Sequence, residues 1–124
     1  TGCRGTNLNC LTDQMLIVAR MAPMFADTVS ALFAASDAGE LPRRLGVKRR
    51  SLFRYHGLYF HCVEFAGDHR EAMRIARDDP EFRRLSDELR PFVTPFDPST
   101  WRSPADAMAE CFYHWTPAGA ADGR

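Results

Sequence analysis

Residues 47–65 read VKRRSLFRYHGLYFHCVEF, and this stretch decides the fold. Apolar and aromatic residues alternate with polar ones on both sides of His56-Gly57, which is typical of a β-hairpin with a two-residue turn. We expect Gly57 to supply the positive φ that such a turn requires. The sequence therefore predicts two antiparallel strands in which Tyr55 pairs with Leu58.

That register divides the hairpin into two faces, because side chains alternate along a strand. One face carries three cross-strand pairs: Arg54 with Tyr59, Leu52 with His61, and Arg50 with Val63. Guanidinium groups and an imidazole among apolar neighbours are more typical of a ligand cavity than of a plain core. The opposite face is mainly apolar and consists of Val47, Ser51, Phe53, Tyr55, Leu58, Phe60 and Cys62.

The segment before the hairpin predicts a strand followed by a helix. Residues 15–22, MLIVARMA, are apolar enough for a buried strand, and Pro23 ends it and precedes the helix. Apolar residues then recur every three or four positions, which predicts a helix over 24–38. The following ELPRR is expected to be a loop.

The segment after the hairpin predicts a second helical region and a last strand. The helical region covers 69–89, and Asp79-Pro80 is expected to interrupt it, because proline disfavours helical geometry in the preceding residue. After a long loop, residues 107–115, AMAECFYHW, predict the fourth strand.

The resulting order β-α-β-β-α-β predicts an α+β protein of the ferredoxin-like class. In this class a four-stranded antiparallel sheet carries both helices on one face. The other face has no cover, so we expect a homodimer that associates through the sheets. Residues 1–14 and 118–124 match no element and are expected to be flexible, which leaves one domain over 15–117.

Composition excludes several classes of function. The chain of 124 residues is 45% hydrophobic, and 16 basic and 16 acidic side chains give a net charge of zero. This balance argues against nucleic acid or an anionic membrane as a partner. No apolar run approaches the roughly 20 residues that span a bilayer, and no secretory signal is recognisable, so a cytoplasmic location is expected.

The cysteines and histidines do not predict a metal site. Four cysteines form no CxxC pair, and no histidine lies at a matching interval. We expect Cys62 and Cys111 to be small buried residues within strands. No cofactor is predicted.

Three separated motifs carry a resemblance to a known family. They are ELPRRLGVKRRSLFRYHGLYFH at 40–61, FVTPF at 92–96 and AECFYHWTP at 109–117. In this order they resemble the small aromatic polyketide cyclases of type II polyketide pathways, from about Leu16 to about Pro117. The resemblance implies a dimer of this fold that closes a ring of an aromatic polyketide intermediate by aldol condensation and dehydration. It also implies other components of the type II synthase as partners.

Three residues are candidates for the chemistry. His61 titrates near neutrality and is suited to proton transfer. Arg50 offers a planar set of N–H donors that stabilises a developing oxyanion. Asp37 stands at the predicted end of a helix, where a carboxylate is unfavourable, so we expect it to pair with Arg50 or to act as a base. The family carries an acid here, usually preceded by a histidine, and this chain has Ser36 instead.

Four further residues are candidates for substrate binding. Arg54 shares the polar face of the hairpin but lies nearer the turn. Tyr59, Trp101 and Trp115 are aromatic residues suited to stacking on a polycyclic ligand, although aromatic strand residues are more often part of a core.

Two alternative functions stay open at this point. One is a cofactor-free monooxygenase that oxidises an anthrone-like substrate on the same fold, since a fold does not fix a function. The other is a non-catalytic dimer that binds a small molecule. Oxygen consumption separates the first alternative from a cyclase, and solvent exposure of Arg50 and His61 would favour the second.

Overall fold

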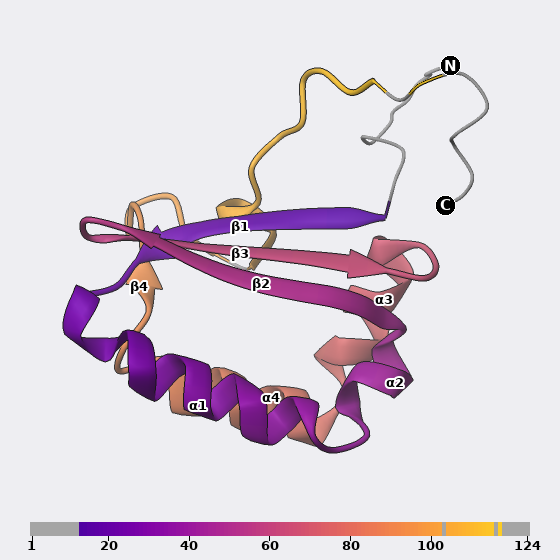
Figure 1. Ribbon diagram of the computed structural model, residues 1–124, viewed down its shortest axis with the longest axis horizontal. Helices are drawn as coiled ribbons and strands as arrows, with labels where there is room; N and C mark the ends of the chain where they lie inside the picture. The colour runs from indigo at the N-terminus through magenta and orange to yellow at the C-terminus, as the bar shows by residue number, and fades with distance from the viewer. Residues whose placement is uncertain (1–12, 103, 116, 118–124) are drawn as a thin grey trace.

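The computed structural model describes residues 13–102, 104–115 and 117 (Figure 1). The elements are β1 (Gln14–Arg20), η1 (Pro23–Phe25), α1 (Ala26–Asp37), α2 (Leu41–Leu45), β2 (Val47–Tyr55), β3 (Leu58–Phe65), α3 (His69–Arg77), α4 (Pro80–Leu89), β4 (Thr94–Pro95) and η2 (Pro104–Ala107). The predicted flexible ends, residues 1–14 and 118–124, lie almost entirely outside the described residues. In the described part of the chain, no helix has the length and apolar character needed to cross a membrane.

The predicted hairpin is confirmed in its pairing. β2 and β3 are antiparallel, with Tyr55 opposite Leu58, and the three predicted pairs of the polar face are all present. The turn differs in one respect. The positive φ belongs to His56, at 55°, and Gly57 has no positive φ. The expectation that the glycine adopts this conformation is therefore wrong, although the turn position is correct.

A β-bulge at the start of β2 corrects the predicted face of one residue. The register shifts between Val47, which pairs with Phe65, and Arg49, which pairs with Glu64. Lys48 and Arg49 both contact Glu64, with N–O distances of 3.8 and 3.9 Å. Because the extra residue reverses the alternation, Val47 lies on the inner face of the sheet and not, as predicted, on the outer face.

The fourth strand is also not where the sequence placed it. The four-stranded antiparallel sheet has the order β2-β3-β1-β4, and β4 consists of Thr94–Pro95 paired with Ala19 and Arg20 of β1. The predicted strand at 107–115 does not form, apart from one bridge between Met108 and Ile17. β4 takes only the Ala19–Arg20 end of this edge of β1, and the later residues reach the rest of the edge only through that bridge. Cys111 is consequently exposed and outside the sheet.

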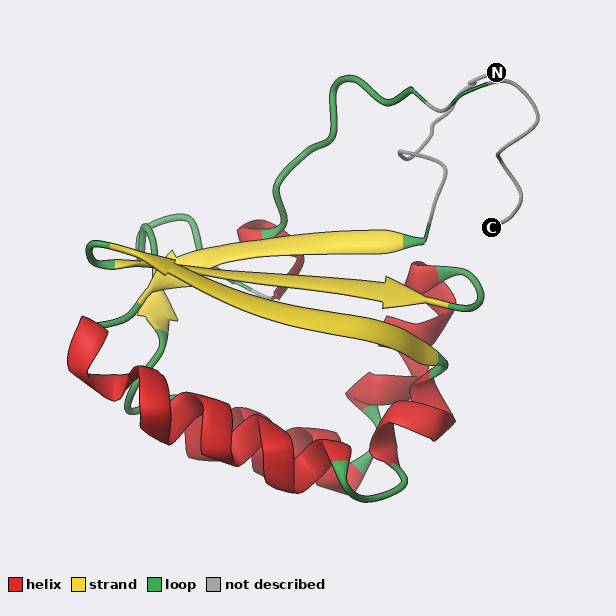
Figure 2. Cartoon of the chain, viewed as in Figure 1, coloured by secondary structure: helices red, strands yellow, loops and turns green. Residues whose placement is uncertain are grey.

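The helices cover one face of the sheet (Figure 2). α1 and α4 run along it, and α2 and α3 lie at one end. Most of the predicted loop ELPRR belongs instead to α2, which ends at Leu45 and is followed by its C-cap Gly46 with a left-handed φ of 75°. Two core clusters form beneath the sheet. One gathers around Leu41, Leu45 and Phe65, and the other around Val29, Phe33 and Tyr59.

Asp79 fixes the interruption between α3 and α4, as predicted at Asp79-Pro80. Its carboxylate caps α4 by accepting hydrogen bonds from the backbone N–H of Glu81 and Phe82, at 2.9 and 3.3 Å. Arg44 of α2 donates to the same carboxylate at 2.9 and 3.2 Å, and this ion pair lowers the pKa of Asp79. One buried side chain thus joins α2, α3 and α4.

We expect Asp79→Ala to lower the free energy of unfolding by about 1 to 2 kcal/mol, the usual effect of losing a helix cap. Asp79→Asn should be milder, because asparagine caps a helix but does not pair with Arg44. Urea unfolding of both variants beside Asp78→Ala, whose side chain is 86% exposed, measures this. Equal losses for Asp79→Ala and Asp78→Ala would contradict the assignment.

Candidate active site

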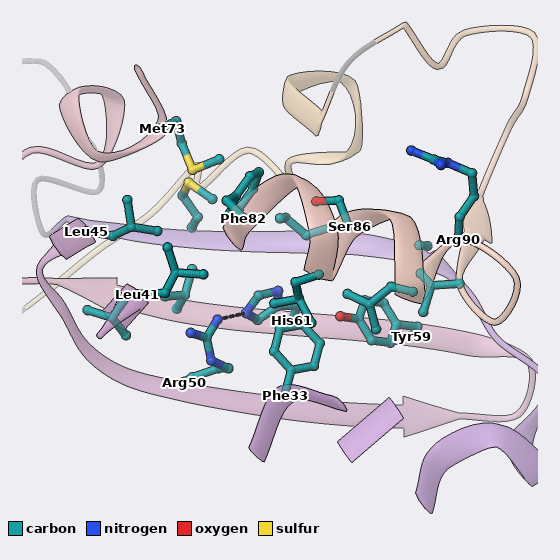
Figure 3. A pocket seen from close by; sticks show the side chains of 18 of the residues that line it. Phe33, Leu41, Leu45, Arg50, Tyr59, His61, Met73, Phe82, Ser86 and Arg90 are labelled. Atoms are coloured by element: carbon teal, nitrogen blue, oxygen red, sulfur yellow. Dashed lines mark hydrogen bonds between the residues drawn. The ribbon is translucent and has the colours of Figure 1, made fainter. Parts of the chain in front are cut away.

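A cavity of about 440 Å³ lies between the inner face of the sheet and the helices (Figure 3). This volume is within the range of small-molecule sites. Most of the lining side chains are apolar and belong to the two core clusters or pack against them. The lining also includes charged and polar side chains, namely Arg50, Tyr59, His61, Ser86, Arg90 and Arg102.

Arg50 makes the central polar contacts of the cavity. Its Nε and Nη2 donate to the two carboxylate oxygens of Asp37 at 3.0 and 2.8 Å, and its Nη1 lies 3.0 Å from Nε2 of His61. The Arg50 side chain is only 14% exposed. A guanidinium on β2 therefore connects the last residue of α1 with the middle of β3.

Phe33 on α1 completes this arrangement. Its ring meets the His61 ring edge to face at a centroid distance of 5.1 Å, and the Arg50 guanidinium lies 5.0 Å from the centroid of the Phe33 ring. The contact holds both polar side chains against the helix layer. The sequence identified Phe33 only as part of the apolar stripe, because nothing in the helix periodicity indicates a neighbour on β3.

His61 is neutral in this environment. Burial lowers its pKa, and the charge of Arg50 lowers it further, to about 4, although Asp37 acts in the opposite direction. Because a guanidinium has only donors, Nε2 of His61 accepts the hydrogen bond from Arg50. The proton of the neutral ring therefore belongs on Nδ1.

The predicted binding residues divide into two groups. Tyr59 and Trp101 line the cavity, and Tyr59 is only 4% exposed. Burial raises the pKa of Tyr59, so its hydroxyl remains a hydrogen-bond donor near neutral pH. Arg54 instead donates to the carbonyl oxygen of Pro23 at 3.0 Å, and Trp115 is 67% exposed. Neither of these two lines the cavity, and their role in binding stays a prediction.

Ser86 on α4, Arg90 at its C-cap and Arg102 were not among the predicted site residues. Ser86 and Arg90 are four positions apart and thus share one face of the helix. The sequence did contain an indication of their position, because Leu85 and Leu89 predict that this face of the helix points inward. Arginines at such positions are also common on protein surfaces, so the pattern alone did not identify Arg90 as a cavity residue.

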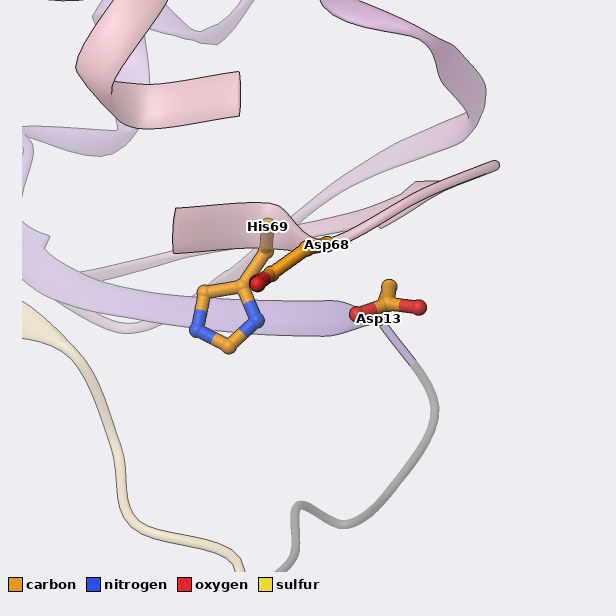
Figure 4. Close-up of side chains that lie close together, drawn as sticks. All are labelled: Asp13, Asp68 and His69. Atoms are coloured by element: carbon orange, nitrogen blue, oxygen red, sulfur yellow. The ribbon is translucent and has the colours of Figure 1, made fainter. Parts of the chain in front are cut away.

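A second polar group lies outside the cavity lining. Asp13, Asp68 and His69 offer ligand atoms within 4.8 Å of one another (Figure 4). Nδ1 of His69 is buried without a hydrogen-bond partner among the described residues. Asp68, however, caps α3 and pairs with Arg70. None of the three residues lines the cavity, and we assign the group no part in the chemistry.

The low pKa of His61 makes stability depend on pH. The unfolded chain binds a proton at this residue near pH 6.5, whereas the folded chain does so only near pH 4, so stability should be complete above about pH 6.5 and fall toward pH 4. The expected decline in the free energy of unfolding from this group is on the order of 3 kcal/mol.

Urea unfolding at fixed protein concentration should show a smaller decline for His61→Gln than for the protein without substitutions. His56→Gln, at the exposed turn, should retain the full decline, and identical pH profiles for all three proteins would exclude this explanation.

Comparisons with known proteins identify relatives of this chain. An uncharacterized protein of Streptomyces coelicolor is 51% identical over 84% of this chain and 96% of its own length. Polyketide synthase CurG of Streptomyces cyaneus is 46% identical over 81% of this chain and 94% of its own length. Tetracenomycin F2 cyclase of Streptomyces glaucescens is 42% identical over 82% of this chain and 92% of its own length.

The structural comparison agrees with the sequence. The solved structure of tetracenomycin F2 cyclase, a type II polyketide cyclase, matches with a TM-score of 0.77 at 41% identity, over 83% of this chain and 96% of that one. The family of polyketide synthesis cyclases matches residues 13–116. The resemblance seen in the three sequence motifs is therefore confirmed, and the chain belongs to the polyketide cyclase family.

Proposed function

We propose that this cyclase closes a ring of an aromatic polyketide intermediate by aldol condensation followed by loss of water. The observation that carries the proposal is the contact between Arg50 and His61, which both line an apolar cavity, with Arg50 held in place by Asp37 in a chain of the polyketide cyclase family. A flexible poly-β-ketone must be folded so that one acidic methylene meets one carbonyl. Orientation of this kind contributes on the order of 7 to 11 kcal/mol to an intramolecular reaction.

Arg50 is the proposed oxyanion-stabilising residue. Three of its five N–H groups are engaged by Asp37 and His61. The two that remain are available to the carbonyl oxygen that becomes an enolate when the methylene loses its proton. Because the guanidinium is fixed before the substrate arrives, it needs little reorganisation as the negative charge develops.

His61 is the proposed proton acceptor. Nε2 of the neutral ring has a lone pair, which accepts a hydrogen bond from Arg50 in the free protein. In the complex, the substrate methylene would displace this hydrogen bond and give its proton to Nε2. The enolate carbon then attacks the facing carbonyl carbon, a C–C bond forms, and the alkoxide receives the proton. Elimination of the hydroxyl group with a neighbouring hydrogen releases water and yields the aromatic ring.

Asp37 is proposed as a positioning residue rather than a base. Both of its oxygens accept from Arg50, so neither is free to take a substrate proton without breaking that pair. The family histidine is absent at Ser36, and Ser36 does not line the cavity. The assigned chemistry therefore rests on His61 and Arg50.

We also propose that the protein is a homodimer formed through the outer face of the sheet. The helices lie on the inner face (Figure 2), and large apolar side chains remain exposed on the outer face, with Phe53 at 58% and Tyr55 at 65%. A second copy would bury them. Association with other components of a type II synthase is proposed as well, from the family resemblance.

Replacing His61 by Ala should lower kcat by roughly 10² to 10⁴, the usual contribution of a general base. Arg50→Ala should lower it comparably, and Arg50→Lys should restore only part, because lysine lacks the planar arrangement of donors. Turnover of a partially cyclised polyketide precursor, followed by product identification, measures both effects.

His56→Ala and Arg49→Ala are matched controls, since both residues are exposed. Full activity in the His61 and Arg50 alanine variants would refute the assigned roles. Oxygen-dependent turnover would instead favour the monooxygenase alternative.

Phe53→Glu should convert the dimer into a monomer, because a charge in an apolar interface is poorly solvated. Light scattering after size exclusion at micromolar concentration measures the mass. Ile75→Glu, on α3 at 38% exposure, should remain dimeric. If the protein without substitutions is monomeric under these conditions, the proposed dimer is contradicted.

A further inference from the structure

Among the described residues, the charges that line the cavity are all of one sign. Three of these lining residues are arginines, Arg50, Arg90 and Arg102, and none of them is Asp or Glu. The chain as a whole has a formal net charge of zero, so this excess is local. Low-dielectric walls focus the field of such charges into a cleft. The cavity should therefore favour a ligand that carries negative charge.

The three arginines are not equivalent, because their partners differ. Arg50 is mostly buried, and its charge is balanced by Asp37. Arg90 pairs with Asp87 at 2.8 Å, but the two side chains are 72% and 64% exposed, and such a surface pair exchanges readily for another anion. Among the described residues, the Arg102 side chain makes no ion pair. The available positive charge thus belongs to Arg90 and Arg102.

These two arginines lie at the open side of the cavity. Both line it and both are exposed to solvent. Arg90 follows directly on α4, and Arg102 comes after β4, whose Pro95 lines the cavity as well. Figure 3 shows Arg90 toward the same end of the cavity as Tyr59, with His61 and Arg50 nearer the middle.

The opposite end of the cavity is apolar. Leu41, Leu45 and Met73 line it there, and they belong to or pack against one core cluster. Tyr59 belongs to the other cluster. Along β3, the distance from Tyr59 to Phe65 is six steps of about 3.3 Å, or about 20 Å. The cavity therefore has an apolar end, a middle that carries Arg50 and His61, and a mouth at the Tyr59 and Arg90 end.

We propose that Arg90 and Arg102 bind a carboxylate at one end of the polyketide substrate, and that the Leu41–Leu45 end of the cavity takes its uncharged end. The proposal rests on the proposed function and adds to it the charge of the substrate and its direction in the cavity. A planar guanidinium pairs with a carboxylate through two parallel hydrogen bonds, which gives orientation as well as affinity. The carbonyls between the two ends then lie beside Arg50 and His61.

Binding of two probes tests the direction without requiring turnover. One probe is a dihydroxyanthraquinone carboxylic acid, and the other is the same dihydroxyanthraquinone without the carboxyl group. Quenching of the Trp101 fluorescence should report occupancy, because Trp101 lines the cavity. We expect the unchanged protein to bind the acid roughly 5- to 30-fold more tightly than the neutral probe, the range of one or two exposed charge-assisted hydrogen bonds.

Arg90→Gln and Arg102→Gln should each reduce this preference for the acid and leave the affinity for the neutral probe unchanged. Arg84→Gln is the matched control, because Arg84 is a 68% exposed arginine of the same helix that does not line the cavity. It should keep the full preference. Equal affinities for the two probes in the unchanged protein, or an undiminished preference in both glutamine variants, would overturn the proposal.

Turnover separates this proposal from the proposed function. If the unchanged protein cyclises a polyketide precursor but shows no preference for the acid probe, the cyclase function stands and the assigned direction is wrong. If it prefers the acid through Arg90 and Arg102 but forms no new ring, the mouth is an anion site and the proposed function fails. For substrates, the glutamine variants should raise KM for a carboxylate substrate with little change in kcat, which distinguishes binding at the mouth from a general loss of structure.

Discussion

The guanidinium of Arg50 is the interaction on which the site depends. It joins Asp37, at the end of α1, to His61, in the middle of β3, across the space between helices and sheet. Asp37 stands where the helix dipole disfavours a negative charge, and Arg50 offsets that charge. Burial lowers the pKa of the neighbouring imidazole, and the charge of Arg50 lowers it further, so His61 stays neutral. The three side chains thus form one connected unit that joins the helix layer to the sheet.

The sequence predicts those parts of the site that depend on contacts between residues close together in the chain. The turn at His56-Gly57 fixes the register of the hairpin, and the register brings Arg50 and His61 to one face. These are short-range constraints that alternation alone reveals. Val47 was misplaced because a β-bulge follows it, at which Lys48 and Arg49 both contact Glu64. Such a shift leaves no trace in the alternation pattern.

The fourth strand could not be predicted from strand propensity. Residues 107–115 have better strand character than Thr94–Pro95, yet the latter form β4. Position decides, because α4 delivers residues 94 and 95 directly to the free edge of β1. A two-residue strand that contains proline is also compatible only with an edge, where no further strand needs its N–H. Intrinsic propensity therefore yields to the connection, and the same connection includes Arg90, which lines the cavity.

The cavity also explains why the core is divided. A chain of this size would gain stability by closing its two clusters into one core, since each buried apolar side chain contributes about 1.5 to 3 kcal/mol. Asp79 and Arg44 instead join α2 to α4, and the mostly buried Arg50 pairs across the strands with Val63 of one cluster and packs against Phe33 of the other. Replacing such a polar group by apolar residues often stabilises a protein. Its presence here therefore indicates that an open, polar middle is maintained against packing, as a binding site for a substrate that fills the space requires.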